Sequence, residues 1–280
     1  MSYTDLFKKP GEWPVDKLRD YFLHHHPADY QLIDVRQLQE YGSEHLPGAL
    51  WIPAEDLPHR LKDLDTSITT IVYCSHGALS GAAALILCKA GFKEVHVLEG
   101  GLHAWHFGTS AGLPGKLSAH LAEAGSAQDQ AILAWQIEEA TRQFYEELSA
   151  TLVEPEVAAL FAELAAAESH HKATLKALWE ALAGRVAGDD FPATARTGHE
   201  LIEGGTRLSE ALAWAERSST ASILDFAMAI ELNAYDHYLH LQRTASDSDS
   251  QRLFEVIAGE ERHHLRSLGK SLEKFHLLAL

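Results

Sequence analysis

The chain has 280 residues, of which 46% are hydrophobic and 22% charged, and its formal net charge at pH 7 is -17. This length suits two domains with cores of their own, and the acidic balance argues against nucleic acid as a partner. No apolar run approaches the roughly 20 residues that cross a bilayer, and the N-terminal residues lack a basic segment followed by an apolar one. We therefore expect a cytoplasmic protein that does not contact a membrane.

The first part of the chain, over 1–108, alternates short β-rich runs with helical stretches. This pattern is typical of an open parallel α/β sheet. Amphipathic segments at 15–23 and 80–90 predict helices. Four strands are expected, at 31–35, 50–52, 70–73 and 95–98.

The chain has only two cysteines, Cys74 and Cys88, too few for a disulfide framework or a thiolate metal site. Cys74 follows the apolar strand at 70–73 and precedes a helix expected to begin near Ser80. Backbone N–H groups at a helix N-terminus stabilise an anion, which favours the thiolate of Cys74. The alternative for Cys74 is a core residue at a strand end, and Cys88 is expected to fill the core.

Several other segments resemble, in chain order, the signature segments of the rhodanese family over about 15–108. They are Asp34-Val35-Arg36, His45-Leu46-Pro47-Gly48-Ala49, the Tyr73-Cys74 loop with Gly77, Ala90-Gly91-Phe92, Leu98-Glu99-Gly100-Gly101 and Trp105. The resemblance implies that Cys74 accepts a sulfane sulfur as a persulfide and passes it to a nucleophile. It also implies that Asp34 and Arg36 brace the fold near the pocket. The persulfide would be held by the loop Ser75, His76, Gly77, Ala78, Leu79 and Ser80.

One loop position departs from the family pattern, because Leu79 stands where an arginine is common. Without that cation, small anions such as thiosulfate bind more weakly, and a cysteine phosphatase or arsenate reductase is disfavoured. The expected sulfur donor is therefore a glutathione persulfide, a protein persulfide or a sulfide-derived species.

From 109 to 127 the sequence becomes rich in Gly, Ser, Pro and Ala, as expected for a linker. The second domain, over 128–280, is rich in Ala, Leu and Glu and has apolar residues at helical spacing. Pro155 suits the first turn of a helix, and Gly184 suits a helix end. Four long helices are predicted, at 128–152, 156–183, 220–244 and 249–275, with a short one at 207–216.

The helical region contains an internal repeat. Glu231 follows Glu138 by 93 residues, and Tyr238 follows Tyr145 at the same shift. Two Glu-x-x-His motifs repeat with this shift as well. The agreement indicates a duplicated helix pair.

The repeated acidic and imidazole residues predict a metal site. Each Glu-x-x-His motif places both side chains on one helix face, and a further glutamate lies one helix upstream. Hard carboxylates can bridge two cations, and burying them without cations would be costly. A four-helix bundle could gather six ligands: Glu138, Glu168, His171, Glu231, Glu261 and His264.

Solvated helix faces are the alternative, because a single Glu-x-x-His is common on exposed helices. The second copy at matching spacing argues against it. Another register, Glu260 with His263, lacks a glutamate at the matching position, Ala167, so Glu261 with His264 is preferred.

Residues 128–275 resemble the rubrerythrin and ferritin-like family, in which this six-ligand pattern binds two irons. The resemblance implies an all-α ferritin-like four-helix bundle with two iron ions, although the ligands also suit manganese or zinc. It implies terminal ligands Glu138 and Glu231, bridging ligands Glu168 and Glu261, one histidine on each metal, and Tyr145 and Tyr238 near the site. A homodimer is also expected by analogy.

Rubrerythrins proper carry a four-cysteine rubredoxin site, whereas no cysteine follows Cys88 in this sequence. A peroxide-reducing role would then need an external electron donor.

Together these features predict a sulfurtransferase at Cys74 linked to a di-iron redox centre that handles peroxide or reactive sulfur. Its partners would be a small sulfur donor or a protein persulfide, and the electron donor. The alternative is a non-catalytic rhodanese-type binding module attached to a bundle that senses or stores iron.

Overall fold

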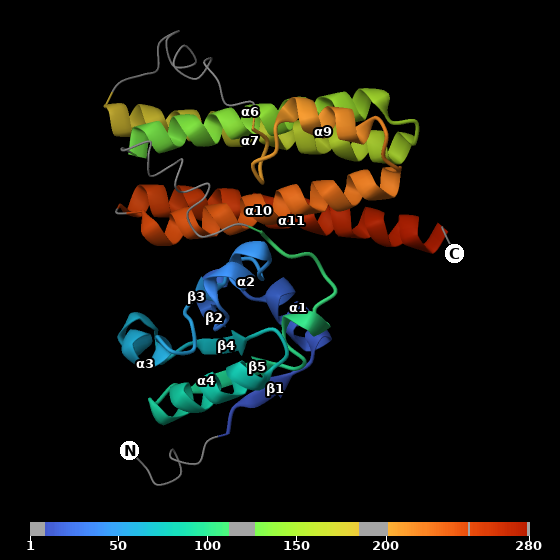
Figure 1. The fold of residues 1–280 in the computed structure, drawn as a ribbon. Helices are drawn as coiled ribbons and strands as arrows, with labels where there is room; N and C mark the ends of the chain where they lie inside the picture. The colour runs from blue at the N-terminus through green and yellow to red at the C-terminus, as the bar shows by residue number, and fades with distance from the viewer. Residues whose placement is uncertain (1–8, 112–126, 185–200, 246, 279–280) are drawn as a thin grey trace. The chain divides into compact units, whose positions relative to one another are not determined.

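The computed structural model describes residues 9–111, 127–184, 201–245 and 247–278 (Figure 1). The chain divides into two compact units, Met1–Leu113 and Pro114–Leu280. The linker expected over 109–127 falls at this division, and its residues 112–126 lie outside the described residues. Each unit has hydrophobic clusters of its own.

The first unit is a parallel sheet with helices packed on it. Among the described residues its strands run in the order β1-β5-β4-β2-β3, and all four pairings are parallel. The elements are β1 (Gly11–Trp13), α1 (Val15–His24), β2 (Tyr30–Asp34), α2 (Leu38–Ser43), β3 (Leu50–Trp51), α3 (Leu57–Arg60), β4 (Thr69–Tyr73), α4 (Ala78–Lys89) and β5 (Glu94–Leu98).

Alternation along the strands divides their apolar side chains between the two faces of the sheet. Ile33 and Val72 pack in one cluster with Leu87 of α4. Leu32 and Ile71, one position earlier on each strand, pack in the other cluster. Because both faces are covered, the strands read as continuous apolar runs, which confirms the predicted α/β sheet.

The sheet has five strands among the described residues, so the prediction of four was wrong. The additional strand, β1, pairs with β5 at the edge of the sheet. Its three residues lie between Pro10 and Pro14 and carry no alternating run from which a strand could be predicted. Burial of Trp13, whose ring stacks on that of His96 with centroids 4.1 Å apart, holds the strand in place.

The register of the sheet places the cysteine loop. Asp34, the last residue of β2, pairs with Tyr73, the last residue of β4. Cys74 therefore leaves the sheet at its carboxyl edge, where parallel α/β sheets bind ligands. The helix α4 begins at Ala78, two residues before the predicted start.

The second unit consists mainly of long helices, as predicted. Figure 1 shows α6 beside α7 and α10 beside α11, and the short α9 packs against α6. The bounds are α6 (Ala127–Thr151), α7 (Pro155–Ala183), α9 (Leu208–Ala215), α10 (Thr220–Thr244) and α11 (Ser248–Leu278).

The helix ends follow from local sequence. Pro155 is the first residue of α7, and Gly184 ends that helix in the left-handed region at φ 62, which confirms both predicted roles. Ser219 caps α10, its side chain accepting a hydrogen bond from the N–H of Ser222. No helix among the described residues is long and apolar enough to cross a membrane.

A buried polar layer separates two apolar clusters inside the bundle. On α6, Ala134 belongs to one cluster and Ala140 to the other, and Glu138 lies between them. On α11 the same change occurs between Ala258 and Leu268. The polar side chains are thus enclosed by apolar residues at both ends.

Candidate functional sites

The Cys74 thiol lies in a cradle formed by the start of α4. Its Sγ accepts hydrogen bonds from the N–H of Gly77 at 3.1 Å and from the N–H of Ser80 at 3.4 Å, and the Ser80 hydroxyl is 3.5 Å away. Burial opposes ionisation, but the hydrogen bonds from Ser80 and from the loop amides outweigh it and lower the pKa of Cys74 below its ordinary value. The site therefore favours a thiolate.

Two glycines allow the cradle its shape. Gly77 precedes α4 with φ 99, a conformation that side chains rarely adopt. A Cβ at Gly101 would lie 2.3 Å from the carbonyl oxygen of Cys74, so only glycine permits this close approach from the loop after β5. In the Gly100-Gly101 segment, Gly101 is therefore the residue that lets the chain pass close to the cysteine loop.

The predicted loop residues differ in what they contact. Ser80 is buried, whereas His76, Ala78 and Leu79 are exposed. Ser75 donates a hydrogen bond to Glu40 at 2.6 Å, a partner on α2 that sequence reasoning did not identify.

The rings of His76 and His103 stack with centroids 4.5 Å apart. This contact adds a second exposed histidine beside the loop.

Asp34 and Arg36 form a buried ion pair. The Arg36 guanidinium donates to both carboxylate oxygens of Asp34 and to the carbonyl oxygen of Glu44 at 2.6 Å. Trp51 donates from its indole nitrogen to the Arg36 carbonyl. The pair links β2 to β3 and the segment after α2, and its guanidinium is engaged in these contacts.

Six predicted ligands converge in the polar layer of the second unit. Glu138 comes from α6, Glu231 from α10, and the two Glu-x-x-His motifs from α7 and α11. The four glutamates and His171 have no exposed surface, and His264 is 8% exposed. None of the six side chains points into solvent.

The ligand atoms form groups that combine the two helix pairs. Glu138, His171 and Glu261 make one group, and Glu168, Glu231 and His264 make another, with ligand atoms in each group within 4.8 Å of one another. Each group thus takes one carboxylate from the opposite Glu-x-x-His motif.

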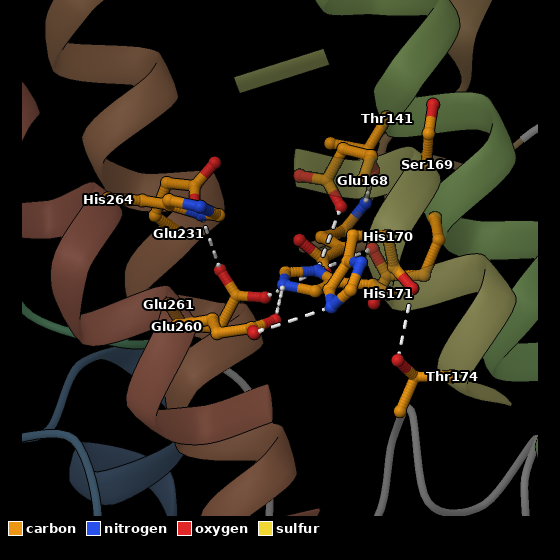
Figure 2. A network of polar contacts seen from close by, with 12 residues as sticks. Thr141, Glu168, Ser169, His170, His171, Thr174, Glu231, Glu260, Glu261 and His264 are labelled. Atoms are coloured by element: carbon orange, nitrogen blue, oxygen red, sulfur yellow. Dashed lines mark hydrogen bonds and ion pairs between the residues drawn. The ribbon is translucent and has the colours of Figure 1, made fainter. Parts of the chain in front are cut away.

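Figure 2 shows the Glu261 carboxylate between the two histidines. Its oxygens lie 3.1 Å from Nδ1 of His171 and 3.2 Å from Nδ1 of His264. A carboxylate in this position can bridge two cations.

Without metal, the carboxylates of the site are balanced by protons. Against the effect of burial, the adjacent carboxylates raise the pKa of His171 well above its usual range and that of His264 to about 10. Burial and the neighbouring Glu138 raise the pKa of Glu168 well above its usual range. Burial and the charge of Glu231 raise the pKa of Glu261 to about 8, although His171 opposes this rise. One buried oxygen of each of Glu138, Glu168 and Glu261 accepts no hydrogen bond.

Cations are the missing partners of these oxygens, and they would take the place of the bound protons. Carboxylate and imidazole donors suit iron, manganese and zinc. The residues therefore fit a pair of metal ions.

A family model of rubrerythrin matches residues 132–272, about half of the chain. The chain belongs to the rubrerythrin family. A model of the rhodanese-like domain matches residues 20–107. One chain therefore contains a rhodanese-like domain followed by a rubrerythrin domain.

Similar proteins were found for part of the chain. Thiosulfate sulfurtransferase GlpE of Shewanella oneidensis is 37% identical over 76 residues, which cover 27% of this chain and 75% of GlpE. The uncharacterized protein YqhL of Bacillus subtilis is 39% identical over 75 residues, covering 27% of this chain and 60% of YqhL. A crystal structure of a rhodanese-like domain protein from Staphylococcus aureus is 26% identical and covers 36% of this chain and 97% of that one, with a TM-score of 0.34.

Two tyrosines of the rubrerythrin domain bind carboxylates of the opposite helix pair. Tyr145 donates a hydrogen bond to Glu231 at 2.6 Å, and Tyr238 donates one to Glu138. Burial and the adjacent carboxylates raise both phenol pKa values well above the usual range. The phenols therefore stay protonated and orient the two carboxylates.

Two glutamates near the rubrerythrin site were not predicted. Glu203 groups with Glu138 and Glu168 within 4.8 Å, and it comes from the connection before α9, where no periodic pattern marks it. Glu260 lies 3.0 Å from Nε2 of His171 and is 36% exposed on its side chain. The repeat argues against Glu260, because it places Ala167 at the matching position, and the structure brings Glu260 to His171 all the same.

Proposed function

We propose that the chain is a rhodanese-type sulfurtransferase with Cys74 as nucleophile, and that its rubrerythrin domain acts as a di-iron oxidoreductase. The cradle around Cys74 carries the first part of the proposal, because its amides already donate to sulfur. The charge of a persulfide on Cys74 would be stabilised by the same donors. The similarity to GlpE, which is named a thiosulfate sulfurtransferase, supports this chemistry.

Sulfur transfer would take two displacements at Cys74. In the first, the thiolate attacks the sulfane sulfur of the donor, a new S–S bond forms, and the donor's bond to that sulfur breaks as the donor leaves with the electron pair. In the second, the acceptor attacks the terminal sulfur of the persulfide, and the bond to Cys74 breaks. The thiolate returns unchanged, so the cycle needs no reductant.

The loop favours an organic persulfide over a small dianion as the donor. Leu79 is 52% exposed at the start of α4, and the nearby Arg36 is occupied by Asp34. A small dianion such as thiosulfate would therefore be bound by the loop amides alone, with no guanidinium from Leu79 or Arg36 to neutralise its second charge. The persulfide group of glutathione persulfide or of a protein persulfide carries a single negative charge, and the carbon skeleton next to it can contact Leu79.

The rubrerythrin domain would hold two iron ions through Glu138, Glu168, His171, Glu231, Glu261 and His264. When bound, iron would supply the electron transfer needed to reduce peroxide or reactive sulfur species. Tyr145 and Tyr238 would orient two of the carboxylates, and the apolar clusters on both sides would limit water. We propose that an external donor provides the electrons.

Sulfur transfer to cyanide tests the first part of this function. Thiocyanate should form from glutathione persulfide with the native chain and with Cys88→Ala, but not with Cys74→Ser. Intact-mass analysis should find one added sulfur on the native chain. If no donor places sulfur on Cys74, the sulfurtransferase proposal is wrong, and a non-catalytic module attached to an iron-sensing or iron-storing bundle becomes the better account.

Elemental analysis of the purified chain tests the second part separately. We expect iron as the metal, with two ions per chain, and an absorption spectrum of the oxidised protein that is lost on chelation. Manganese or zinc in place of iron would contradict the di-iron assignment while leaving the ligand set intact, and zinc would also contradict the redox role.

A further inference from the structure

Glu203 lies in a tight turn that is fastened to the bundle. The N–H of Ile202 donates to the carbonyl oxygen of Thr206, and Gly204 and Gly205 reverse the chain with φ 83 and 81. The N–H of Glu203 itself donates to the Thr141 hydroxyl at 3.1 Å.

Both anchors of this turn lie on helices that form the metal site. Thr141 is buried on α6, one turn after Glu138. A Cβ at Gly204 would lie 3.0 Å from the side-chain amide of Asn233 on α10, so the turn also seats closely there. These contacts fix the backbone from which the Glu203 side chain reaches inward.

The Glu203 carboxylate is buried among the acidic ligands of the site. It is 4% exposed, and one of its oxygens has no hydrogen-bond partner. Its ligand atom lies within 4.8 Å of those of Glu138 and Glu168, which are acidic as well. A buried carboxylate among carboxylates stays ionised only when something positive lies between them.

Glu203 lies in the connection between the two helix pairs, outside both copies of the repeat. The shift of 93 residues maps Glu138 onto Glu231, and among the described residues only the Glu138 side has a further carboxylate grouped with two glutamates of the site. Glu260 has the same one-sidedness, since it contacts His171 and its counterpart is Ala167.

We infer that Glu203 is a seventh protein ligand, which binds the metal ion on the Glu138 and His171 side of the site. This inference rests on the proposed di-metal function. It makes the two ions inequivalent, because one side gains a hard oxygen ligand and a full negative charge. That ion is bound more tightly than its neighbour, and it is the one that a hard divalent cation fills first.

Cobalt(II) titration of the metal-free full chain tests the inference without any assay of activity. Calorimetry gives the two dissociation constants, and visible absorption reports the ligands of each ion. In Glu203→Gln we expect the tighter constant to weaken by about 10- to 100-fold, with a change in the spectrum of that ion, while the weaker constant stays the same. Glu210→Gln, which removes an exposed carboxylate on α9, is the matched control and should leave both constants unchanged.

The possible outcomes separate the two proposals. If the native chain does not bind two cobalt ions, the di-metal function fails. If it binds two and Glu203→Gln binds both with native constants, Glu203 is not a ligand. Equal weakening of both ions would overturn the one-sided assignment.

Thermal unfolding of the metal-free chain guards against a folding artefact. Burial and the neighbouring glutamates raise the pKa of Glu203 well above its usual range, so without metal Glu203→Gln replaces a neutral acid by a neutral amide of similar shape, and its Tm should stay close to that of the native chain. The increase in Tm on adding cobalt should be smaller in the variant. A metal-free Tm well below native would mean that Glu203 serves the fold, and this would contradict the inference.

Discussion

The two sites of this chain hold negative charge by different means. Around Cys74, backbone amides do most of the work, and the required residues are those that permit the loop geometry, such as Gly77 and Gly101. In the rubrerythrin domain, side chains supply every proposed ligand, six of them from four helices and Glu203 from the turn before α9. A site made from the backbone tolerates many sequences, whereas a site made from side chains fails when one residue type changes.

Removing two carboxylates from the bundle should give the largest effect. Glu168→Ala combined with Glu261→Ala takes away both proposed bridges, so bound metal should fall from about two ions per chain to less than one. Elemental analysis after anaerobic loading measures this. The matched control, Glu163→Ala with Glu255→Ala, removes exposed glutamates from the same two helices.

The same double variant should not be less stable than the native chain when both are metal-free. It removes two carboxyl groups whose burial is unfavourable, as their raised pKa values indicate, and this gain offsets the cavity that the truncations leave. If the double variant still bound two metal ions, Glu168 and Glu261 would not be ligands. The contrast between a site made from side chains and a site made from the backbone would then fail as well.

A new charge at the backbone-made site should have a substrate-dependent effect. Leu79→Arg places a guanidinium at the loop, and the KM for thiosulfate should fall by about ten-fold, as expected for one charge-assisted hydrogen bond. Glutathione persulfide should show little change. Leu85→Arg, an exposed position two turns along the same helix, is the control, and an equal effect there would point to general attraction rather than to the loop.

The Ser80 hydroxyl should matter for the acidity of the thiol. Ser80→Ala removes the hydroxyl that lies 3.5 Å from the Cys74 sulfur and helps to lower the pKa of the thiol, so the pKa of Cys74 should rise. Because the thiolate is the reactive form, alkylation by iodoacetamide should then begin at higher pH than in the native chain.

Ser75→Ala is the matched control for this experiment, because the Ser75 hydroxyl donates to Glu40 and not to sulfur. The native alkylation profile should be unchanged in that variant. Identical profiles for Ser80→Ala and the native chain would show that the amides alone set the acidity.

The smallest effect is expected at the tyrosines. Tyr238→Phe removes the hydrogen bond to Glu138 but leaves all proposed ligands, so metal affinity should weaken by less than about ten-fold. Tyr145→Phe should do the same for the ion bound by Glu231. Competition with a chromophoric chelator measures both, and a complete loss of metal in either variant would contradict a purely orienting role.

How much the sequence revealed follows the same contrast between the sites. The six helical metal-site residues could be found because helix spacing and the repeat leave a pattern in the residue types. Glu203 could not be found, since it lies in a turn outside the repeat and reaches the site through tertiary contacts alone. Glu40 was missed for the same reason, because its contact with Ser75 joins residues 35 positions apart.

In the rhodanese-like domain, the strands with long apolar runs were predictable and β1 was not. A buried strand leaves a run of β-branched residues, as in β4, whereas β1 has three residues that are held by the burial of Trp13. Local propensity is too weak to define so short an edge strand.

The crossed hydrogen bonds of Tyr145 and Tyr238 imply something about how such a bundle can arise. Each helix pair has a tyrosine that donates a hydrogen bond to a carboxylate of the other pair. Each group of ligand atoms likewise includes a carboxylate from the other pair. One helix pair on its own could not complete either group, but two identical copies associating face to face could complete both. The segment that joins the two pairs in one chain breaks this symmetry, because it places a glutamate on one side of the site and not on the other.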